Sequence, residues 1–184
     1  MILEPITQQA VIETERYQLR PLQVSDAGLI ALHTGDLRVA RMTSSIPHPL
    51  PPGTTEAFIA RCQSAERSED AWAIDATKSG GAELLGVIGL KHVDDEACEL
   101  GYWVAPQFWN SGIASEAVQA LIEVNPLRCK TFFATVFQGN AASARVLTNC
   151  GLNIWAMPKA IACRGMRRFR HGPIASDAIE AWPP

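Results

Sequence analysis

The sequence has no long hydrophobic run and no large excess of charge of either sign. No apolar stretch in its 184 residues approaches the roughly 20 residues that a membrane-spanning helix needs. Lys and Arg number 16 against 19 Asp and Glu, which gives a formal net charge of -3. Proteins that bind nucleic acid through its phosphates normally carry a basic surplus. We therefore predict a protein that neither spans a membrane nor binds nucleic acid.

Metal sites and disulfide frameworks also lack their usual sequence patterns. The five cysteines are odd in number, no two of them have C-x-x-C spacing, and the four histidines are equally dispersed. The N-terminal sequence MILEPITQQAVIETER has early acidic residues and no basic segment, so it is unlike a signal peptide. We therefore expect reduced thiols, no metal ion and a cytoplasmic protein. The residues concerned are Cys62, Cys98, Cys129, Cys150, Cys163, His33, His48, His92 and His171.

The glycine-rich motifs that cradle nucleotide phosphates are missing as well. Neither G-x-G-x-x-G nor the P-loop pattern occurs, which argues against the usual dinucleotide- and triphosphate-binding folds. What the chain does have is the composition of a globular protein, with 47% hydrophobic and 19% charged residues. Its length suits one domain over residues 1–184.

Hydrophobic periodicity predicts an α/β (α+β) architecture. Three strand-like segments follow each other on short turns between residues 71 and 105, which favours an antiparallel meander. The later order β-α-β-α-β favours a mixed sheet. Strands are expected at 15–22, 71–77, 83–93, 96–105, 130–137 and 164–172, and helices at 25–36, 36–43, 54–66, 114–124 and 140–151. The expected helix N-caps are Ser25 or Asp26, Thr54 or Thr55, and Asn140.

The segment PQFWNSGIASEAV, residues 106–118, places small residues where a helix begins. The first turn of a helix has N–H groups without intrahelical acceptors, and it carries the positive end of the helix dipole. Small side chains let phosphate oxygens approach those N–H groups. The same residues also suit close packing of the helix on a sheet, so this segment alone leaves both interpretations open.

A second helix start follows the next strand. In NAASARVLTNCGL, residues 140–152, Asn140 is expected to cap the helix and Ser143 to lie in its first turn. Taken alone, this pattern indicates a capped helix with a solvated serine.

In combination, the segments ELGYWV, WNSGIASEA and NAASARVLTNCGL resemble the GCN5-related N-acetyltransferase (GNAT) superfamily over residues 14–172. Residues 109–114 fit the family's pyrophosphate loop, roughly Q/R-x-x-G-x-G/A, with Trp109 in the first place. Asn140, Ser143 and Leu147 fit its N-x-x-S-x-x-x-L helix, although the spacing to Gly151 is widened by one residue. The tryptophan variant resembles the branch of ribosomal-protein alanine and serine N-acetyltransferases. The resemblance implies a GNAT fold, with a mixed, mostly antiparallel central sheet of about six to seven strands flanked by helices.

The resemblance also implies acetyl-CoA as the cosubstrate and assigns residues to it. The loop and first helical turn would hold the pyrophosphate through their backbone, Trp103 and Val104 on the preceding strand would contact the pantetheine arm, and Asn140 would bind its amide region. Ser143 would lie near the thioester sulfur. The loop residues are Trp109, Asn110, Ser111, Gly112, Ile113, Ala114 and Ser115.

A base is needed because the attacking amine must be neutral. The family often uses a glutamate on the strand before the loop, which makes Glu99 the first candidate. Strand alternation puts Glu99 on one face with Gly101 and Trp103. His92, at the end of the neighbouring predicted strand, is the alternative base or water partner.

Tyrosine is scarce, and this affects the expected catalysis. Many family members protonate the leaving group with a tyrosine on or after the last helix, but the chain has only Tyr17 and Tyr102. Ser143 is therefore the residue expected to hydrogen-bond the sulfur. The missing tyrosine also motivates an alternative function, a non-catalytic module that binds acetyl-CoA.

The acetyl acceptor is the least defined part of the prediction. The branch resemblance implies a primary amine at a protein N-terminal Ala or Ser, with a free amino acid, a polyamine or an antibiotic as alternatives. The acceptor pocket is expected from the loops at 43–55 and 153–163, with Pro47 and His48 as wall residues. The arginine-rich segment 164–170 is expected to be a strand with one solvated face. The protein is expected to be a monomer or a homodimer.

Overall fold

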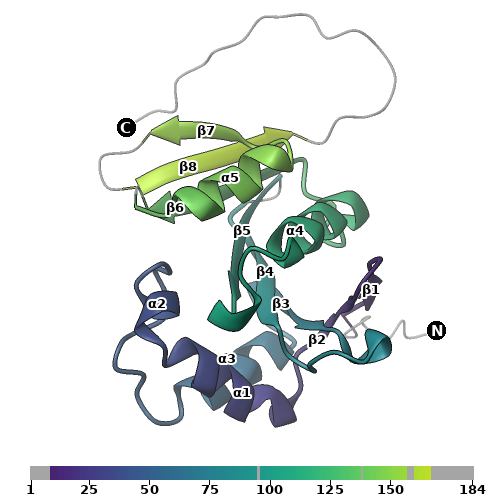
Figure 1. Ribbon diagram of the computed structural model, residues 1–184. Helices are drawn as coiled ribbons and strands as arrows, with labels where there is room; N and C mark the ends of the chain where they lie inside the picture. The colour runs from purple at the N-terminus through teal and green to yellow at the C-terminus, as the bar shows by residue number, and fades with distance from the viewer. Residues whose placement is uncertain (1–8, 95, 138, 157–159, 167–184) are drawn as a thin grey trace, which may run out of the picture.

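One sheet runs through the described part of the chain, with helices on both of its faces (Figure 1). The computed structural model describes residues 9–94, 96–137, 139–156 and 160–166, and side chains as far as Asn153. The strand order in the sheet is β1-β2-β3-β4-β5-β6-β8-β7. This confirms the predicted mixed sheet flanked by helices.

All neighbouring strands pair antiparallel except β5 and β6, which are parallel. The predicted meander is confirmed as β3, β4 and β5. The strands are β1 (Ile12–Glu13), β2 (Gln18–Pro21), β3 (Glu69–Asp75), β4 (Gly86–His92), β5 (Ala97–Val104), β6 (Thr131–Phe137), β7 (Asn153–Ala156) and β8 (Ala160–Met166).

The C-terminal end of the sheet differs from the prediction. Segment 153–163 is not a loop, because β7 and β8 pair antiparallel and supply most of it. Of the strand predicted at 164–172, residues 164–166 end β8 and the rest lie outside the described residues. The segments NIWA and AIAC lack the polar alternation that marks a strand in sequence, so the hairpin was not apparent. With the short strand β1, it brings the described sheet to eight strands instead of six to seven.

Two separate hydrophobic cores lie on the two faces of the sheet, each between the strands and a pair of helices. Ala71 and Ala73 of β3 face the core formed with α1 and α3, whereas Trp72 and Ile74 face the core formed with α4 and α5. No helix in the described ranges is long and apolar enough to cross a membrane. The helices are α1 (Ala27–Thr34), α2 (Leu37–Ala40), α3 (Thr54–Gln63), α4 (Ile113–Val124) and α5 (Ala141–Asn149).

The helix ends agree with the sequence signals in part. Asn140 caps α5, because its side chain accepts a hydrogen bond from the Ser143 N–H group. Helix α3 begins after Gly53, with φ of 80°, so Gly53 is its N-cap instead of a threonine. Asp26 stands at the N-cap of α1, but its side chain makes no capping bond to that helix.

The Asp26 carboxylate belongs instead to a buried charge cluster. Arg20 donates two hydrogen bonds to Asp26, at 2.9 and 2.8 Å, and a third to Asp75 at 2.6 Å. Both carboxylate side chains are almost completely buried. Burial raises the pKa of Asp75, but hydrogen bonds from Thr77 and Arg20 outweigh burial and the net pKa is lowered. One guanidinium therefore compensates two buried acids and ties β2 to β3 and to the start of α1.

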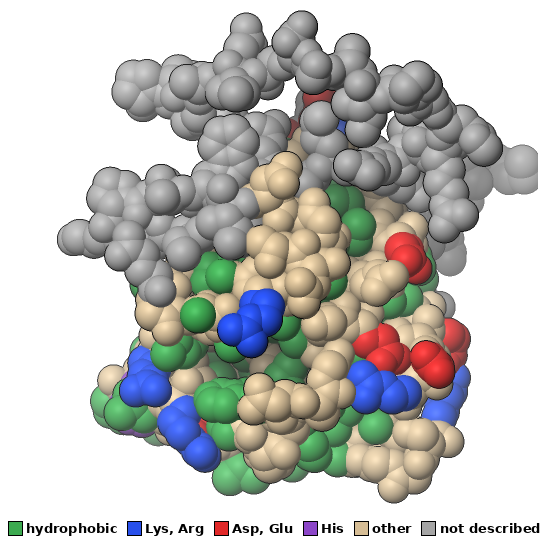
Figure 2. All heavy atoms as spheres, turned by 45° about the horizontal axis from the view of Figure 1, so that its top comes forward, with side chains coloured by type: hydrophobic (Ala, Val, Ile, Leu, Met, Phe, Trp, Pro, Cys, Tyr) green, Lys and Arg blue, Asp and Glu red, His purple; other side chains and the backbone are tan. Residues whose placement is uncertain are grey.

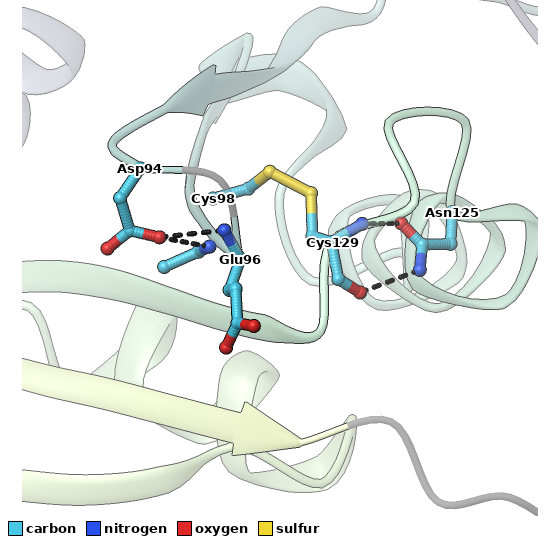
Figure 3. The surroundings of a disulfide bond; sticks show 6 residues. Asp94, Glu96, Cys98, Asn125 and Cys129 are labelled. Carbon is cyan, nitrogen blue, oxygen red and sulfur yellow. Dashed lines mark hydrogen bonds between the residues drawn. A yellow bond between two sulfur atoms is a disulfide. The ribbon is translucent and has the colours of Figure 1, made fainter.

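A disulfide corrects the expectation of reduced thiols. Cys98 of β5 is bonded to Cys129, with Cα atoms 5.9 Å apart, whereas Cys62 and Cys150 are free (Figure 3). Asn125 fixes Cys129 by accepting a bond from its N–H group and donating one to its C=O group. The two cysteines are 31 residues apart, and only the parallel pairing of β5 with β6 brings them together. Sequence spacing gave no sign of this contact.

Arg20→Ala should destabilise the protein by about 3–5 kcal/mol, because it leaves two buried carboxylates without a counter-charge. Urea denaturation at pH 7 measures the loss. Arg38→Ala is the matched control, since Arg38 pairs with Asp36 at the exposed surface and its removal should change the midpoint little. The deficit of Arg20→Ala should shrink as the pH falls below about 4 towards the lowered pKa of Asp75, because protonation of Asp75 removes its ion pair from the parent. Equal midpoints for the two variants would contradict this account.

Candidate active site

The site begins where β5 and β6 separate. The two parallel strands pair at only three positions, the last of them Glu99 with Phe133. Beyond this point β5 continues to Val104 and β6 to Phe137, with no further pairing between them. A cavity of about 1040 Å³ opens there and is lined by residues of both strands.

The backbone of β5 presents one edge to this opening. Ala105 donates its N–H to Leu85 C=O, and the Trp103 C=O group lies against Gly86 of β4. Because the backbone groups of a strand alternate between its two edges, those of Val104 face the opening and those of Trp103 face β4. The Trp109 indole N–H donates to the Val104 C=O group at 2.6 Å. Trp103 therefore contributes its side chain to the cavity and not its backbone.

The loop before α4 reaches the opening with its backbone. Asn110 and Gly112 have φ of 60° and 81°, and this left-handed turn starts α4 at Ile113. The first intrahelical hydrogen bond is donated by Glu116 to Gly112, so the N–H groups of residues 113–115 have no acceptor within the helix. All predicted pyrophosphate-binding residues from Trp109 to Ser115 line the cavity. The arrangement suits a bound anion.

Helix α5 brings its first turn to the same opening. Asn140 and Ser143 both line the cavity, and the cap holds the Ser143 backbone in place. The Ser143 Oγ atom lies 2.9 Å from the hydroxyl oxygen of Tyr102 on β5. Sequence reasoning did not select Tyr102, although its place in ELGYWV implied a strand facing a following helix.

Carboxylates line the opposite side of the opening. Glu69 of β3, Lys91 of β4 and Glu99 of β5 are paired in register, so their side chains share one face of the sheet. Glu99 Oε1 accepts a hydrogen bond from Thr135 Oγ1 at 3.3 Å. Burial raises the pKa of Glu69, and the negative charge of Glu99 adds to the increase. The cavity therefore has two acids on one face and two hydroxyl groups on the other.

This arrangement has counterparts among known proteins. The sequence model of the acetyltransferase (GNAT) domain matches residues 16–153, three quarters of the chain. The chain belongs to the GNAT acetyltransferase family. Membership makes it an acetyl-CoA-dependent N-acetyltransferase, and it confirms the resemblance inferred from the sequence.

Proteins similar to this chain include N-acetyltransferases that act on different acceptors. The chain is 28% identical to the Bacillus subtilis N-acetyltransferase YoaA over 150 residues, covering 77% of this chain and 81% of YoaA. The structure of RimL, a ribosomal L7/L12 α-N-protein acetyltransferase solved with coenzyme A, has a TM-score of 0.71 at 15% identity and covers 85% and 98% of the two chains. Spermidine N-acetyltransferase from Vibrio cholerae, solved with coenzyme A and spermine, has a TM-score of 0.69 at 12% identity, covering 82% and 95%. These structural likenesses show the shared fold.

The GNAT cavity fits the parts of acetyl-CoA. The open N–H groups at the start of α4 suit the pyrophosphate, the Val104 edge of β5 suits the amides of pantetheine, and Ser143 lies where the two strands diverge. Every residue that the sequence assigned to the coenzyme lines this one cavity.

The structure does not bring His92 to the cavity. His92 pairs with Cys98 in the register of β4 and β5, so it lies on the sheet face opposite Lys91 and Glu99. Its side chain is exposed and does not line the cavity. Pro47 lines the cavity as expected, whereas His48 does not.

Arg16 lies near the start of α4, and no sequence pattern had indicated that it would be there. Arg16 donates to the Ser111 C=O group at 2.9 Å and to Glu116 at 2.6 Å. The hydrogen bond to Glu116 raises the pKa of Arg16. Arg16 precedes β2 and lies 100 residues from Glu116, so only the fold shows that this ion pair lies beside the predicted pyrophosphate site.

The rest of the cavity lies between the sheet and the segment from α2 to α3. Phe58, Trp103 and Ile46 give it an apolar wall, and Arg38, Arg41 and Arg61 are its basic members. Figure 2 shows Lys and Arg side chains set around a hydrophobic hollow on this face, with Asp and Glu gathered to one side. In the described ranges no group of three or more His, Cys, Asp or Glu side chains is placed to hold a metal ion.

Gly112→Ala should weaken acetyl-CoA binding about tenfold. Alanine at φ of 81° is strained by about 1–2 kcal/mol, and its Cβ would lie 3.3 Å from Arg16 Nη2, so the helix start must shift. Titration calorimetry with coenzyme A measures the affinity. Gly28→Ala in α1, where the added Cβ meets nothing within 4 Å, is the matched control and should bind normally. Normal binding by Gly112→Ala would exclude this loop as the pyrophosphate site.

Proposed function

We propose that the protein acetylates the primary amine of a protein or peptide N-terminus that begins with Ala or Ser, with Glu99 as the base. The observation that carries the proposal is the position of Glu99 and Ser143, which line one cavity from the two faces of β5. An amine entering from the α1 and α3 side meets Glu99, while the thioester sulfur lies beside Ser143.

The carboxylates prepare the amine for attack. An ammonium group is attracted to Glu69 and Glu99, which flank Lys91 on the same sheet face. The ammonium first loses one proton to solvent, and Glu99 then accepts a second proton, directly or through one water, as the neutral amine forms its bond to the acetyl carbon. The hydrogen bond from Thr135 orients the Glu99 carboxylate.

The coenzyme is held by the backbone and by α5. The first turn of α4 binds the pyrophosphate through its open N–H groups, and Arg16 donates a hydrogen bond to the Ser111 C=O group of the preceding loop. The Val104 edge of β5 and Asn140 of α5 position the pantetheine arm. The resulting placement holds the acetyl carbon between the amine and Ser143.

The lining of the acceptor half favours an acceptor with one positive charge. Besides the two carboxylates, Arg41, Arg61 and Lys91 line this half, so the further ammonium groups of a polyamine would meet like charges there. An N-terminal Ala or Ser brings a single ammonium and a small side chain. RimL, which acts on a protein N-terminus, has a similar fold and supports this assignment.

Release of free thiol from acetyl-CoA, measured with a panel of amines, tests the acceptor. Peptides that begin with Ala or Ser should give the highest kcat/KM, above peptides that begin with Met, free amino acids, spermidine and aminoglycosides. A preference for spermidine would contradict the charge argument. If only one class of small molecule is acetylated, that class and not a peptide is the acceptor.

Glu99→Gln should lower kcat by about 10²–10⁴-fold, the usual contribution of a general base. Its affinity for acetyl-CoA should be unchanged, because Glu99 lies on the acceptor face. Glu96→Gln is the control, since Glu96 is exposed at the start of the same strand and pairs with Lys130 outside the cavity. A Glu99→Gln variant within about threefold of the parent rate would remove Glu99 as the base and leave Glu69 to be tested in the same way.

A further inference from the structure

A phenol on β5 reaches the serine that the family resemblance places beside the thioester sulfur. Tyr102 and Ser143 both line the cavity, and their hydroxyl oxygens are 2.9 Å apart. The chain has no tyrosine after residue 102, so none can come from α5 or from the segment beyond it. Tyr102 instead reaches Ser143 from the strand.

Strand alternation separates Tyr102 from the carboxylates. Trp103 packs with the core of α1 and α3, whereas Leu100 and Tyr102 pack with the core of α4 and α5. Glu99 and Tyr102 are three residues apart and therefore lie on opposite faces of β5. Because β6 has diverged at this point, both faces are open to the same cavity.

We propose that Tyr102 and Ser143 form a hydrogen-bond relay that stabilises the departing coenzyme A thiolate. The Tyr102 hydroxyl donates to Ser143 Oγ, and the Ser143 hydroxyl donates to the sulfur. Hydrogen bonds in series strengthen one another, so the phenol makes Ser143 a better donor as negative charge develops on sulfur. This assignment rests on the acetyl transfer proposed above, and it adds a residue that positions and polarises Ser143.

The step balances without any further reactant. The amine nitrogen forms a bond to the acetyl carbon, the C–S bond breaks, and its electron pair leaves on sulfur. The amine proton goes to Glu99. The thiolate holds the hydrogen bond from Ser143 until it takes a proton from water, and Glu99 returns its proton to water. Tyr102 donates a hydrogen bond in this step and transfers no proton.

Tyr102→Phe tests the relay, because it keeps the packed ring and removes only the hydroxyl. We expect kcat to fall about 5- to 10-fold, as for the loss of one hydrogen bond between neutral groups, with little change in acetyl-CoA affinity or thermal midpoint. Ser143→Ala should fall at least as far. The double variant should be little worse than Ser143→Ala, because the two hydroxyls act in one chain.

A better leaving group distinguishes the relay from a structural role. The selenoester of coenzyme A releases a selenolate, which is a weaker base than a thiolate and needs less stabilisation. The deficit of Tyr102→Phe should therefore shrink to within about threefold with acetyl-seleno-CoA. Tyr17→Phe is the control, since Tyr17 donates a hydrogen bond to Ile113 C=O at the start of α4. Its loss should lower the rate with acetyl-CoA and with acetyl-seleno-CoA by the same factor.

Hydrolysis of acetyl-CoA and of acetyl-seleno-CoA by the enzyme, measured without any amine, provides the same comparison. Failure of the peptide panel, with the selenium rescue retained, would overturn only the proposed acceptor. The relay would be overturned if Tyr102→Phe were as active as the parent with acetyl-CoA. It would also be overturned if the variant lost the same activity with both acetyl donors. The proposed function would stand in either case.

Discussion

The separation of β5 from β6 beyond Glu99 is the constraint on which the rest of the site depends. Parallel pairing holds the two strands together at three positions, and the disulfide from Cys98 to Cys129 joins them at the closed end. Past that point the Val104 edge of β5 faces the cavity instead of a strand. A peptide-like ligand such as pantetheine can then bind that edge as a strand would. Both faces of β5 also become accessible from a single cavity.

The same parallel pair explains why two distant sequence motifs meet. Strands β5 and β6 run in one direction, so both end at the same side of the sheet, and each is followed by a helix. The N-terminal turns of α4 and α5 therefore gather at the opening, where their N–H groups and dipoles favour anionic or polar groups. Arg16 and Glu116 form an ion pair beside the start of α4, so their charges compensate each other there. The side of the site proposed for the coenzyme is thus built largely from backbone, and the side proposed for the acceptor from side chains.

Much of this could be predicted residue by residue. Local signals were sufficient for the Asn140 cap, the end of α4 at Asn125 and the three-strand meander, because each depends on neighbours within a few residues. The hairpin of β7 and β8 was wrongly predicted as a loop, since its short apolar segments carry no period. The Cys98–Cys129 bond and the Arg16–Glu116 pair join residues 31 and 100 positions apart, and no local pattern reports such contacts.

By itself, the sequence determined the family, and it predicted the coenzyme loop and the residues near it, because those features are written in short contiguous motifs. Only the tertiary structure decided how those residues face one another. Strand register placed His92 on the face away from Glu99, and the divergence of β6 allowed Glu99 and Tyr102, on opposite faces of one strand, to reach the same cavity. Side-chain direction in a sheet alternates with every residue, so a function that needs both faces depends on a gap that no sequence period encodes.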